Sequence, residues 1–234
     1  MESNKEYFSM AETSAQDEDT QSQEDQHHDE PEGRKVCCCV VLREGYGLPQ
    51  FLMMVMGLFS TFYAMFTAVL FLVLLITSPR YFNVQKEESG QSVSAIILAT
   101  EVVNIAVFLV VGLLYDTIGR RPLLVTGEIL TAVFILCLPY SGSVLPGLLL
   151  SRCGIAISTS VILGSPLLVD YIHDKSKGIT MAVMGLVGGL SVILVTVVEL
   201  KLAQSHPLEV FFYPPSVLCL LTALAMYFFL KEPP

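Results

Sequence analysis

The sequence predicts an all-α, polytopic membrane protein, and three observations lead to that prediction. Apolar residues make up 53% of the 234 residues, charged residues only 15%, and the mean hydropathy is +0.63. A soluble domain has about 25% charged residues, most of them on its surface. In addition, apolar stretches of about 20 residues, long enough to cross a ~30 Å hydrocarbon layer as helices, recur along the chain. We therefore expect several transmembrane helices.

The N-terminal segment is acidic and polar. Residues 1–35 contain eleven acidic and three basic residues, so −8 of the formal net charge of −9 belongs to this segment. Its few apolar residues cannot bury enough surface to offset the entropy lost on folding. We expect residues 1–47 to form a disordered acidic tail on the cytoplasmic side. No basic stripe occurs elsewhere in the sequence, so we expect no nucleic-acid partner.

Three consecutive cysteines, Cys37, Cys38 and Cys39, lie between this tail and the first apolar segment. Beside Arg34 and Lys35, which suit anionic lipid headgroups, they are candidates for S-acylation. The alternative is that they are small apolar residues at the membrane interface, and the sequence leaves both interpretations open. The other three cysteines stand singly in apolar runs, a pattern that favours neither a disulfide framework nor a metal site.

Six segments are long and apolar enough to span the membrane. Each of the second, third and fourth contains one ionisable residue: Glu101, Glu128 and Arg152, respectively. The six predicted spans cover about 50–78, 92–115, 122–141, 144–169, 179–199 and 208–230.

The positions of Lys and Arg predict the orientation of these spans. With the N-terminus in the cytoplasm, eight of these residues between positions 34 and 231 fall on the cytoplasmic side and three on the other. Cytoplasmic loops carry the excess of positive charge, so we expect both termini inside. The loops are short and leave no room for a soluble catalytic domain. No predicted span contains a histidine near a nucleophile or metal ligand, so we expect no enzyme activity, no cofactor and no metal.

The junction between the second and third spans carries a distinctive pattern. Gly112 would allow another helix to approach closely, and Asp116 can accept hydrogen bonds from a helix N-terminus or an arginine. Gly119 permits a tight turn. Arg120 and Arg121 would hold the turn on the cytoplasmic side. A simple basic loop would explain the two arginines but neither the glycines nor the aspartate.

This stretch resembles the signature loop between helices two and three of the major facilitator superfamily, Gly-x-Leu-Ala-Asp-Arg-x-Gly-Arg-Arg-x-x-Leu. Tyr115 and Thr117 depart from the pattern. The resemblance extends over residues 50–234 and implies one six-helix half of that fold. Seven positions match at identical spacing: Gly112, Leu114, Asp116, Gly119, Arg120, Arg121 and Leu124.

The resemblance also implies a cytoplasmic charge network that holds one conformation closed. Asp170, at the junction of the fourth and fifth spans, joins Asp116 and Arg120 as a candidate for this gate. The alternative is that Asp170 and the charged residues after it only solvate a loop.

Polar residues inside the predicted spans suggest a second group of functional positions. Glu101 and Arg152 fall at similar depth, where opposite charges could pair, and Asn104 shares the helix face of Glu101. The resemblance places Arg152 where many family members carry an arginine linked to coupling or substrate charge, whereas a purely structural pair remains the alternative. We expect Glu128 to be structural and either shielded by Arg120 or Arg121 or extended towards them at the inner end of the span.

Two glycines of the fifth predicted span, Gly185 and Gly189, form a small-x-x-x-small stripe suited to close helix contacts. The resemblance implies a transporter of a small-molecule solute that works by alternating access between two six-helix halves. The chain ends shortly after the sixth span, so we expect a half or truncated transporter that needs a second six-helix unit or forms a homodimer in the lipid bilayer. Uncovered faces on the second and fifth spans would favour such pairing. The alternative is a non-transporting membrane interaction or regulatory protein.

Overall fold

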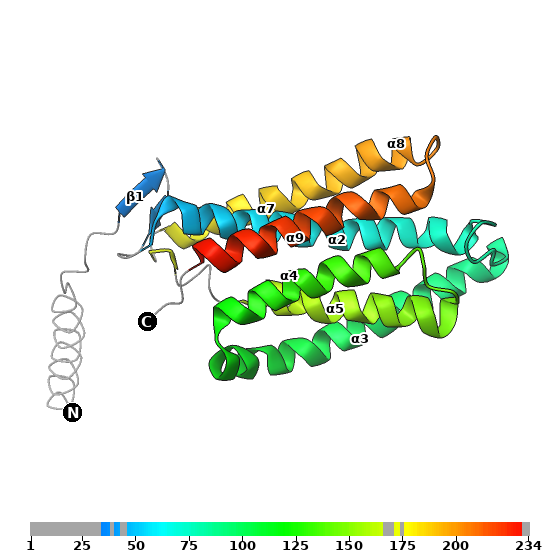
Figure 1. Cartoon of the computed structure of the whole chain (residues 1–234), viewed down its shortest axis with the longest axis horizontal. Helices are drawn as coiled ribbons and strands as arrows, with labels where there is room; N and C mark the ends of the chain where they lie inside the picture. Colours follow the sequence, from blue (N-terminus) through cyan, green and yellow to red (C-terminus); the bar gives the residue numbers. More distant parts are fainter. Residues whose placement is uncertain (1–33, 38–39, 43–45, 166–170, 174–175, 231–234) are drawn as a thin grey trace, which may run out of the picture. The chain divides into compact units, whose positions relative to one another are not determined.

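The described residues of the computed structural model, 34–37, 40–42, 46–165, 171–173 and 176–230, are nearly all helical. They belong to Arg34–Pro234, the second of two units into which the chain divides. Long helices lie side by side in this unit, and short turns connect most of them (Figure 1). The predicted all-α class is confirmed. The elements are β1 (Arg34–Cys37), β2 (Val40–Leu42), α2 (Leu48–Thr77), α3 (Lys86–Ile118), α4 (Arg120–Cys137), η1 (Val144–Leu148), α5 (Leu149–Leu163), α7 (Lys177–Ile193), η3 (Leu194–Glu199), α8 (Leu200–Leu202), η4 (Leu208–Phe212) and α9 (Tyr213–Phe229).

Local sequence accounts for several helix ends. The backbone N–H of Gly47 donates to Gln50 Oε1 at 2.9 Å, which satisfies one group at the start of α2. α3 ends at Ile118 because Gly119 adopts a φ of 96°, a conformation that favours glycine, and α4 begins at the next residue. The tight turn predicted at Gly119 is therefore present.

The helix α5 ends at Leu163, earlier than the predicted span of 144–169. Proline disfavours helical backbone at the residue before it, here Ser165, so the helix stops short of Pro166. Residues 166–170 lie outside the described part of the chain.

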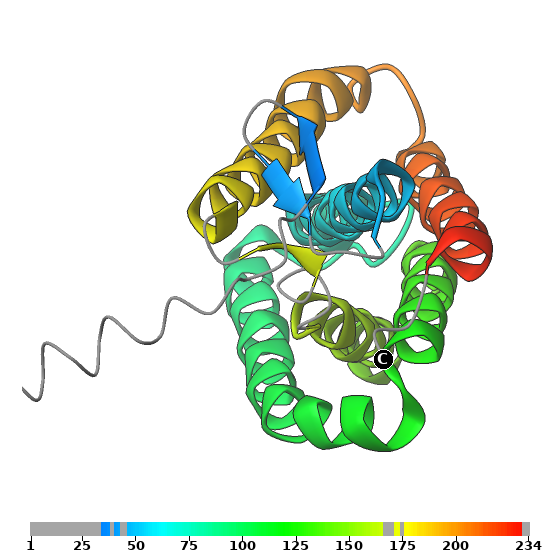
Figure 2. The same cartoon turned by 90° about the vertical axis from the view of Figure 1, so that its left-hand side faces the viewer.

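The helices form a series in which each packs on the next: α7, α2, α9, α4, α5 and α3. The end-on view in Figure 2 shows α2 near the middle of the bundle and places the two ends of the series, α3 and α7, on the same side. Fully buried apolar side chains such as Phe71, Leu72 and Phe212 fill the space between α2 and its neighbours. The bundle is thus well packed around α2 and less covered along α3 and α7.

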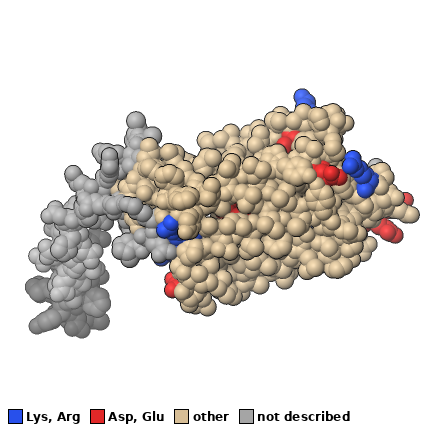
Figure 3. Space-filling view, in the orientation of Figure 1, with Lys and Arg blue, Asp and Glu red and all other residues tan. Residues whose placement is uncertain are grey.

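Among the described residues, five helical segments are long and apolar enough to cross a membrane. The sixth helix of the bundle, α4, is not among them because its 18 residues include Arg120, Arg121 and Glu128. On the face drawn in Figure 3, charged side chains lie mainly toward the two ends of the bundle and the surface between them is mostly uncharged.

The segment before α2 contains structure that the sequence did not predict. β1 pairs antiparallel with β2, and Leu42 forms an isolated bridge with Ile172. The backbone N–H of Val41 also donates to Ser176 Oγ at 3.0 Å. The expectation of disorder over residues 1–47 is therefore wrong for this hairpin, because pairing with the connection before α7 satisfies its backbone groups. Residues 1–33, Cys38 and Cys39 lie outside the described part.

Candidate functional site

The turn between α3 and α4 is held against the end of α9. The guanidinium of Arg121 donates a hydrogen bond to the carbonyl of Tyr227, and its Cζ lies 5.3 Å from the centre of the Tyr227 ring. This combines a hydrogen bond to a cation with a cation–π contact. Asp116 is exposed in the last turn of α3, and Asp170 lies outside the described residues. The gate that combines Asp116, Arg120 and Asp170 therefore stays a prediction.

The glycines expected to mediate helix packing make no close contact with the described residues. Among those residues, no heavy atom lies within 4 Å of the position that a Cβ would take at Gly112, Gly185 or Gly189. These three residues lie on the least covered helices, α3 and α7. Close contacts occur instead at glycines of the central helices: Gly57 faces Met226, Gly127 faces Ile162, and Gly154 faces Phe134.

Polar residues of α3 and α5 are linked by a short chain of hydrogen bonds. Asn104 donates from Nδ2 to Glu101 Oε2 at 3.2 Å, and Ser160 Oγ donates to Asn104 Oδ1 at 2.8 Å. Glu101 is exposed, whereas Arg152 on α5 is 6% exposed and its Nε has no hydrogen-bond partner in the part of the chain that the structure describes. Glu101 attracts the Arg152 guanidinium electrostatically but does not form a direct ion pair with it. The predicted pair is thus a longer-range interaction, and Asn104 bonds across to α5.

Glu128 on α4 is completely buried against α2 and α9. Its Oε1 lies 3.1 Å from Ser60 Oγ and 3.0 Å from Thr61 Oγ1, and the thiol of Cys219 lies beside the same carboxyl group. The expectation that arginines shield Glu128 is wrong, because the side chain points into the bundle and is bound by hydroxyls. Ser60 and Thr61 could have been identified as candidates because adjacent hydroxyl residues are unusual in the apolar first span.

Glu199 is a buried carboxyl group that the sequence analysis missed, because it was taken as the boundary of the fifth span. It is 5% exposed, accepts a hydrogen bond from the Tyr63 hydroxyl, and lies 3.3 Å from Thr67 Oγ1. Glu199 ends the π-helical turn η3, and such turns often occur at functional sites. Buried residues recur every four positions at Val187, Ser191, Val195 and Glu199. The wider π turn keeps this four-residue row facing α2.

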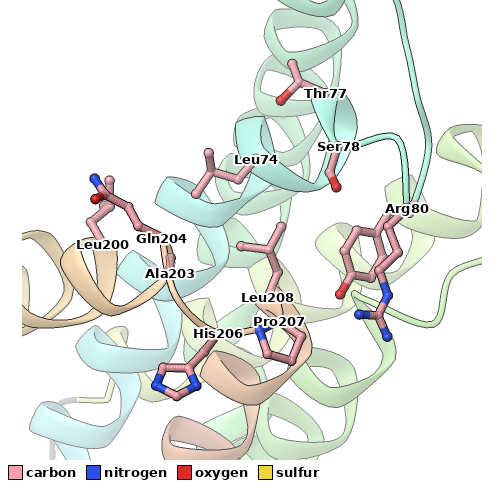
Figure 4. Close-up of a pocket in the computed structure, with 11 residues that line it drawn as sticks. Leu74, Thr77, Ser78, Arg80, Leu200, Ala203, Gln204, His206, Pro207 and Leu208 are labelled. Atoms are coloured by element: carbon pink, nitrogen blue, oxygen red, sulfur yellow. The ribbon is translucent and has the colours of Figure 1, made fainter.

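A cavity of about 480 Å³ lies where the end of α2 meets the turn before η4 (Figure 4). Nearby, Glu209 accepts a hydrogen bond from Tyr81 Oη at 3.1 Å and pairs with Arg80 at 3.4 Å. Burial, followed by the bond to Glu209, raises the pKa of the Tyr81 phenol above its ordinary value. The cavity is lined by Leu74, Thr77, Ser78, Arg80, Tyr81, Leu200, Ala203, Gln204, His206, Pro207 and Leu208. Within the described ranges, no three His, Cys, Asp or Glu side chains cluster as a metal site would require.

The comparison with protein families agrees with the helical arrangement. Residues 45–234 match the family model described as Major Facilitator Superfamily. The search of curated proteins gave no match. Members of the matched family are membrane transporters of small-molecule solutes rather than enzymes. Together with the five apolar helices, the match makes this an integral, multi-pass membrane protein. Because the match covers most of the sequence, the chain belongs to the Major Facilitator Superfamily.

Proposed function

We propose that this chain is a six-helix unit of a solute transporter and that it works together with a second six-helix unit packed against α3 and α7. The supporting observation is the uneven burial of the helices. In the most apolar stretches of α3 and α7 only 17% of residues are buried, against 44% to 56% in the other three candidate spans. These two helices lie on the same side of the bundle (Figure 2). In this proposal α4 is the sixth span and both termini are cytoplasmic.

The residues on this open side are better suited to a partner and a cavity than to lipid alone. Gly112, Gly185 and Gly189 leave room for the close approach of another helix. Glu101 is exposed on α3, and a charged side chain in hydrocarbon costs at least about 2.5 kcal/mol. A water-filled cavity between two units would solvate this carboxylate. Arg152, buried nearby with an unpaired Nε, would supply the opposite charge at the cavity wall.

In this arrangement the two units would rock about the solute site near the bilayer midplane. Glu101, Asn104 and Arg152 are the candidates for contact with solute or coupling ion. The turn around Gly119, fixed by Arg121 on α9, would form the cytoplasmic side of the gate with Asp116, Arg120 and Asp170. The juxtamembrane Cys37, Cys38 and Cys39 remain candidates for lipidation.

The association can be tested by native mass measurement of the chain in lipid nanodiscs, with Gly185→Leu as the disruptive variant. We expect the wild-type chain to form dimers of two six-helix units and Gly185→Leu to shift it to monomers, because leucine fills the space at the interface. Val133→Leu on α4 is a matched control, since Val133 is 48% exposed on the other side of the series. A wild-type chain found only as monomers would contradict self-association.

Transport itself is tested by uptake of a panel of labelled small solutes into vesicles that contain the assembled unit. Uptake by wild type and Val133→Leu, with loss in Gly185→Leu, is the expected result. A stable dimer that takes up none of the solutes would instead favour the alternative function, a membrane interaction or regulatory protein.

A further inference from the structure

The carboxyl groups of Glu128 and Glu199 are both buried beside α2. They differ in whether the neighbouring hydroxyl groups of α2 have another acceptor for their hydrogens. Ser60 Oγ and Thr61 Oγ1, which contact Glu128, also lie 2.8 Å from the carbonyl oxygen of Gly57 one turn earlier. Tyr63 and Thr67, which contact Glu199, have no competing carbonyl acceptor in the described chain. The hydroxyls near Glu199 can therefore both donate to it.

The two hydroxyls near Glu128 have a competing acceptor, and hydroxyl hydrogens that point at it leave an ionised carboxylate only the weak thiol donor of Cys219 among the described residues. The two hydroxyls make five contacts, two with the Gly57 carbonyl and three with Glu128. Serine and threonine in helices donate preferentially to the carbonyl three or four residues earlier, and here those contacts are the shortest. Once the hydroxyl hydrogens point at Gly57, the hydroxyl oxygens can only accept from Glu128. A carboxylate has no hydrogen to donate, whereas a carboxylic acid has one.

No cation among the described residues compensates a charge on Glu128. The facing titratable group on α9 is Cys219, a weak donor whose thiol contacts the Glu128 carboxyl and also lies 3.7 Å from the Ser60 carbonyl oxygen. α2 contains no charged residue. On α5 the charged residue is Arg152, six residues or about 9 Å along the helix from Ser158, which bonds to Thr131 of α4.

Further ionisable groups, on α3 and α4, are either exposed or hydrogen-bonded to a backbone carbonyl. On α3, Glu101 and Asp116 are exposed and Tyr115 donates to the carbonyl of Val161. Arg121, on α4 itself, donates to the Tyr227 carbonyl. An isolated charge in such a site is strongly disfavoured, and groups in this situation neutralise.

We propose that Glu128 is a proton-binding site within the bundle, a neutral carboxylic acid that donates to the hydroxyl oxygens of Ser60 and Thr61. The ligand is a proton rather than a metal ion, because oxygens 2.8 to 3.2 Å apart are already in hydrogen-bonding contact. A Ca²⁺ ion would need six to eight oxygen ligands, whereas the described contacts around Glu128 bring together five oxygens, from Glu128, Ser60, Thr61 and Gly57. Release of the proton requires the hydroxyls to turn from Gly57 to the new carboxylate, or α4 to move from α2.

Infrared difference spectroscopy between H2O and D2O, on the full chain in lipid at neutral pH, tests this proposal. We expect a carbonyl stretch of a protonated carboxylic acid in the wild type. The band should be lost in Glu128→Gln and kept in the matched control Glu199→Gln. The measurement needs only the folded chain, so it does not depend on transport or on a second unit. Absence of the band in the wild type, or its persistence in Glu128→Gln, would overturn the proposal.

A second variant keeps the test decisive if Glu128→Gln folds poorly. Thr61→Val leaves the carboxyl in place and removes one hydroxyl acceptor, so the band should remain and move to higher wavenumber. A band that does not move would place the proton elsewhere and contradict the proposal. Stabilisation of the wild type by Na⁺, without a protonated-carboxyl band, would identify a metal cation instead of a proton.

Discussion

Polar side chains in the centre of the bundle and on its open side, along α3 and α7, differ in burial and in hydrogen bonding. In the centre, Glu128 and Glu199 are buried and each meets hydroxyls of α2. On the open side, Glu101 is exposed on α3 and the Nε of Arg152 has no hydrogen-bond partner among the described residues. Satisfied polar groups stabilise a packed interior, whereas unsatisfied ones point to a role outside the isolated chain. The difference separates residues that hold the six helices together from residues that await water, solute or a second unit.

The largest expected effect is at Tyr63 in the centre. Tyr63→Phe removes a hydroxyl donor from the buried carboxyl of Glu199 and should lower the free energy of unfolding by about 2 kcal/mol. Unfolding by titration with a denaturing detergent in mixed micelles would measure this. Tyr140→Phe serves as the control: this tyrosine lies in the turn after α4 and its hydroxyl contacts that of Tyr213 at an exposed position, so its loss should change stability little. Equal losses in both variants would show that Glu199 does not depend on Tyr63.

A smaller effect is expected at Gly57, where α2 contacts α9. A Cβ there would lie 2.0 Å from Met226 Cε, so the flexible methionine must move and the site of Glu128 becomes crowded. We expect Gly57→Ala to cost about 1 kcal/mol by overpacking. Gly188→Ala, on α7, meets only ordinary contact with Phe62 at 3.6 Å and should be neutral or slightly stabilising. The same denaturation measurement compares the two, and a stable Gly57→Ala would remove the packing argument for this contact.

On the open side, Arg152 should matter for transport and not for stability. Replacing a buried, poorly satisfied charge by an apolar side chain of similar length is often neutral or favourable, so we expect Arg152→Met to change the unfolding free energy by less than about 0.5 kcal/mol. Solute uptake by the assembled unit should fall strongly in the same variant. Uptake at the wild-type level with lowered stability would assign Arg152 to the structure instead.

The smallest expected effect on stability is at the end of the bundle near the cavity. There the carboxyl group of Glu209, unlike those of Glu128 and Glu199, contacts a tyrosine outside the helices, Tyr81. The raised pKa of Tyr81 means that its neutral phenol is favoured by folding. This contribution is complete below pH 10.0, the ordinary pKa, and is lost as the pH rises through the higher folded value. Tyr81→Phe should therefore flatten a slight decline in thermal stability above pH 10, and an identical decline in both proteins would contradict this.

The sequence predicted the elements that rest on local patterns. The all-α class, the six helices and the turn at Gly119 follow from apolar length and glycine conformation, and the structure contains them. The fourth span was predicted to run to residue 169, whereas α5 ends at Leu163, because apolar length alone does not register how Pro166 restricts the backbone of the residue before it. The hairpin before α2 was missed because its second strand is also bonded to a segment far along the chain, near Ile172.

The candidate site was harder to predict because side-chain partners come from distant helices. Arg121 was correctly placed at the turn, but its partner, the Tyr227 carbonyl, lies 106 residues away. Glu128 was noticed but given the wrong neighbours, since helical phase alone does not say which helix it faces. Glu199 was overlooked because a π turn, which keeps it directed at α2, has no clear mark in the sequence.

If α3 lines a water-filled cavity between two units, as we propose, position 101 is accessible to water, and thiol labelling at this position measures that accessibility. After replacement of the six native cysteines by alanine, Glu101→Cys would be labelled with a membrane-impermeant thiol reagent in sealed vesicles and in opened ones. Leu221→Cys on α9, 59% exposed, is the lipid-facing comparison. We expect labelling at position 101 and protection at position 221. Equal protection of both positions would contradict this proposal.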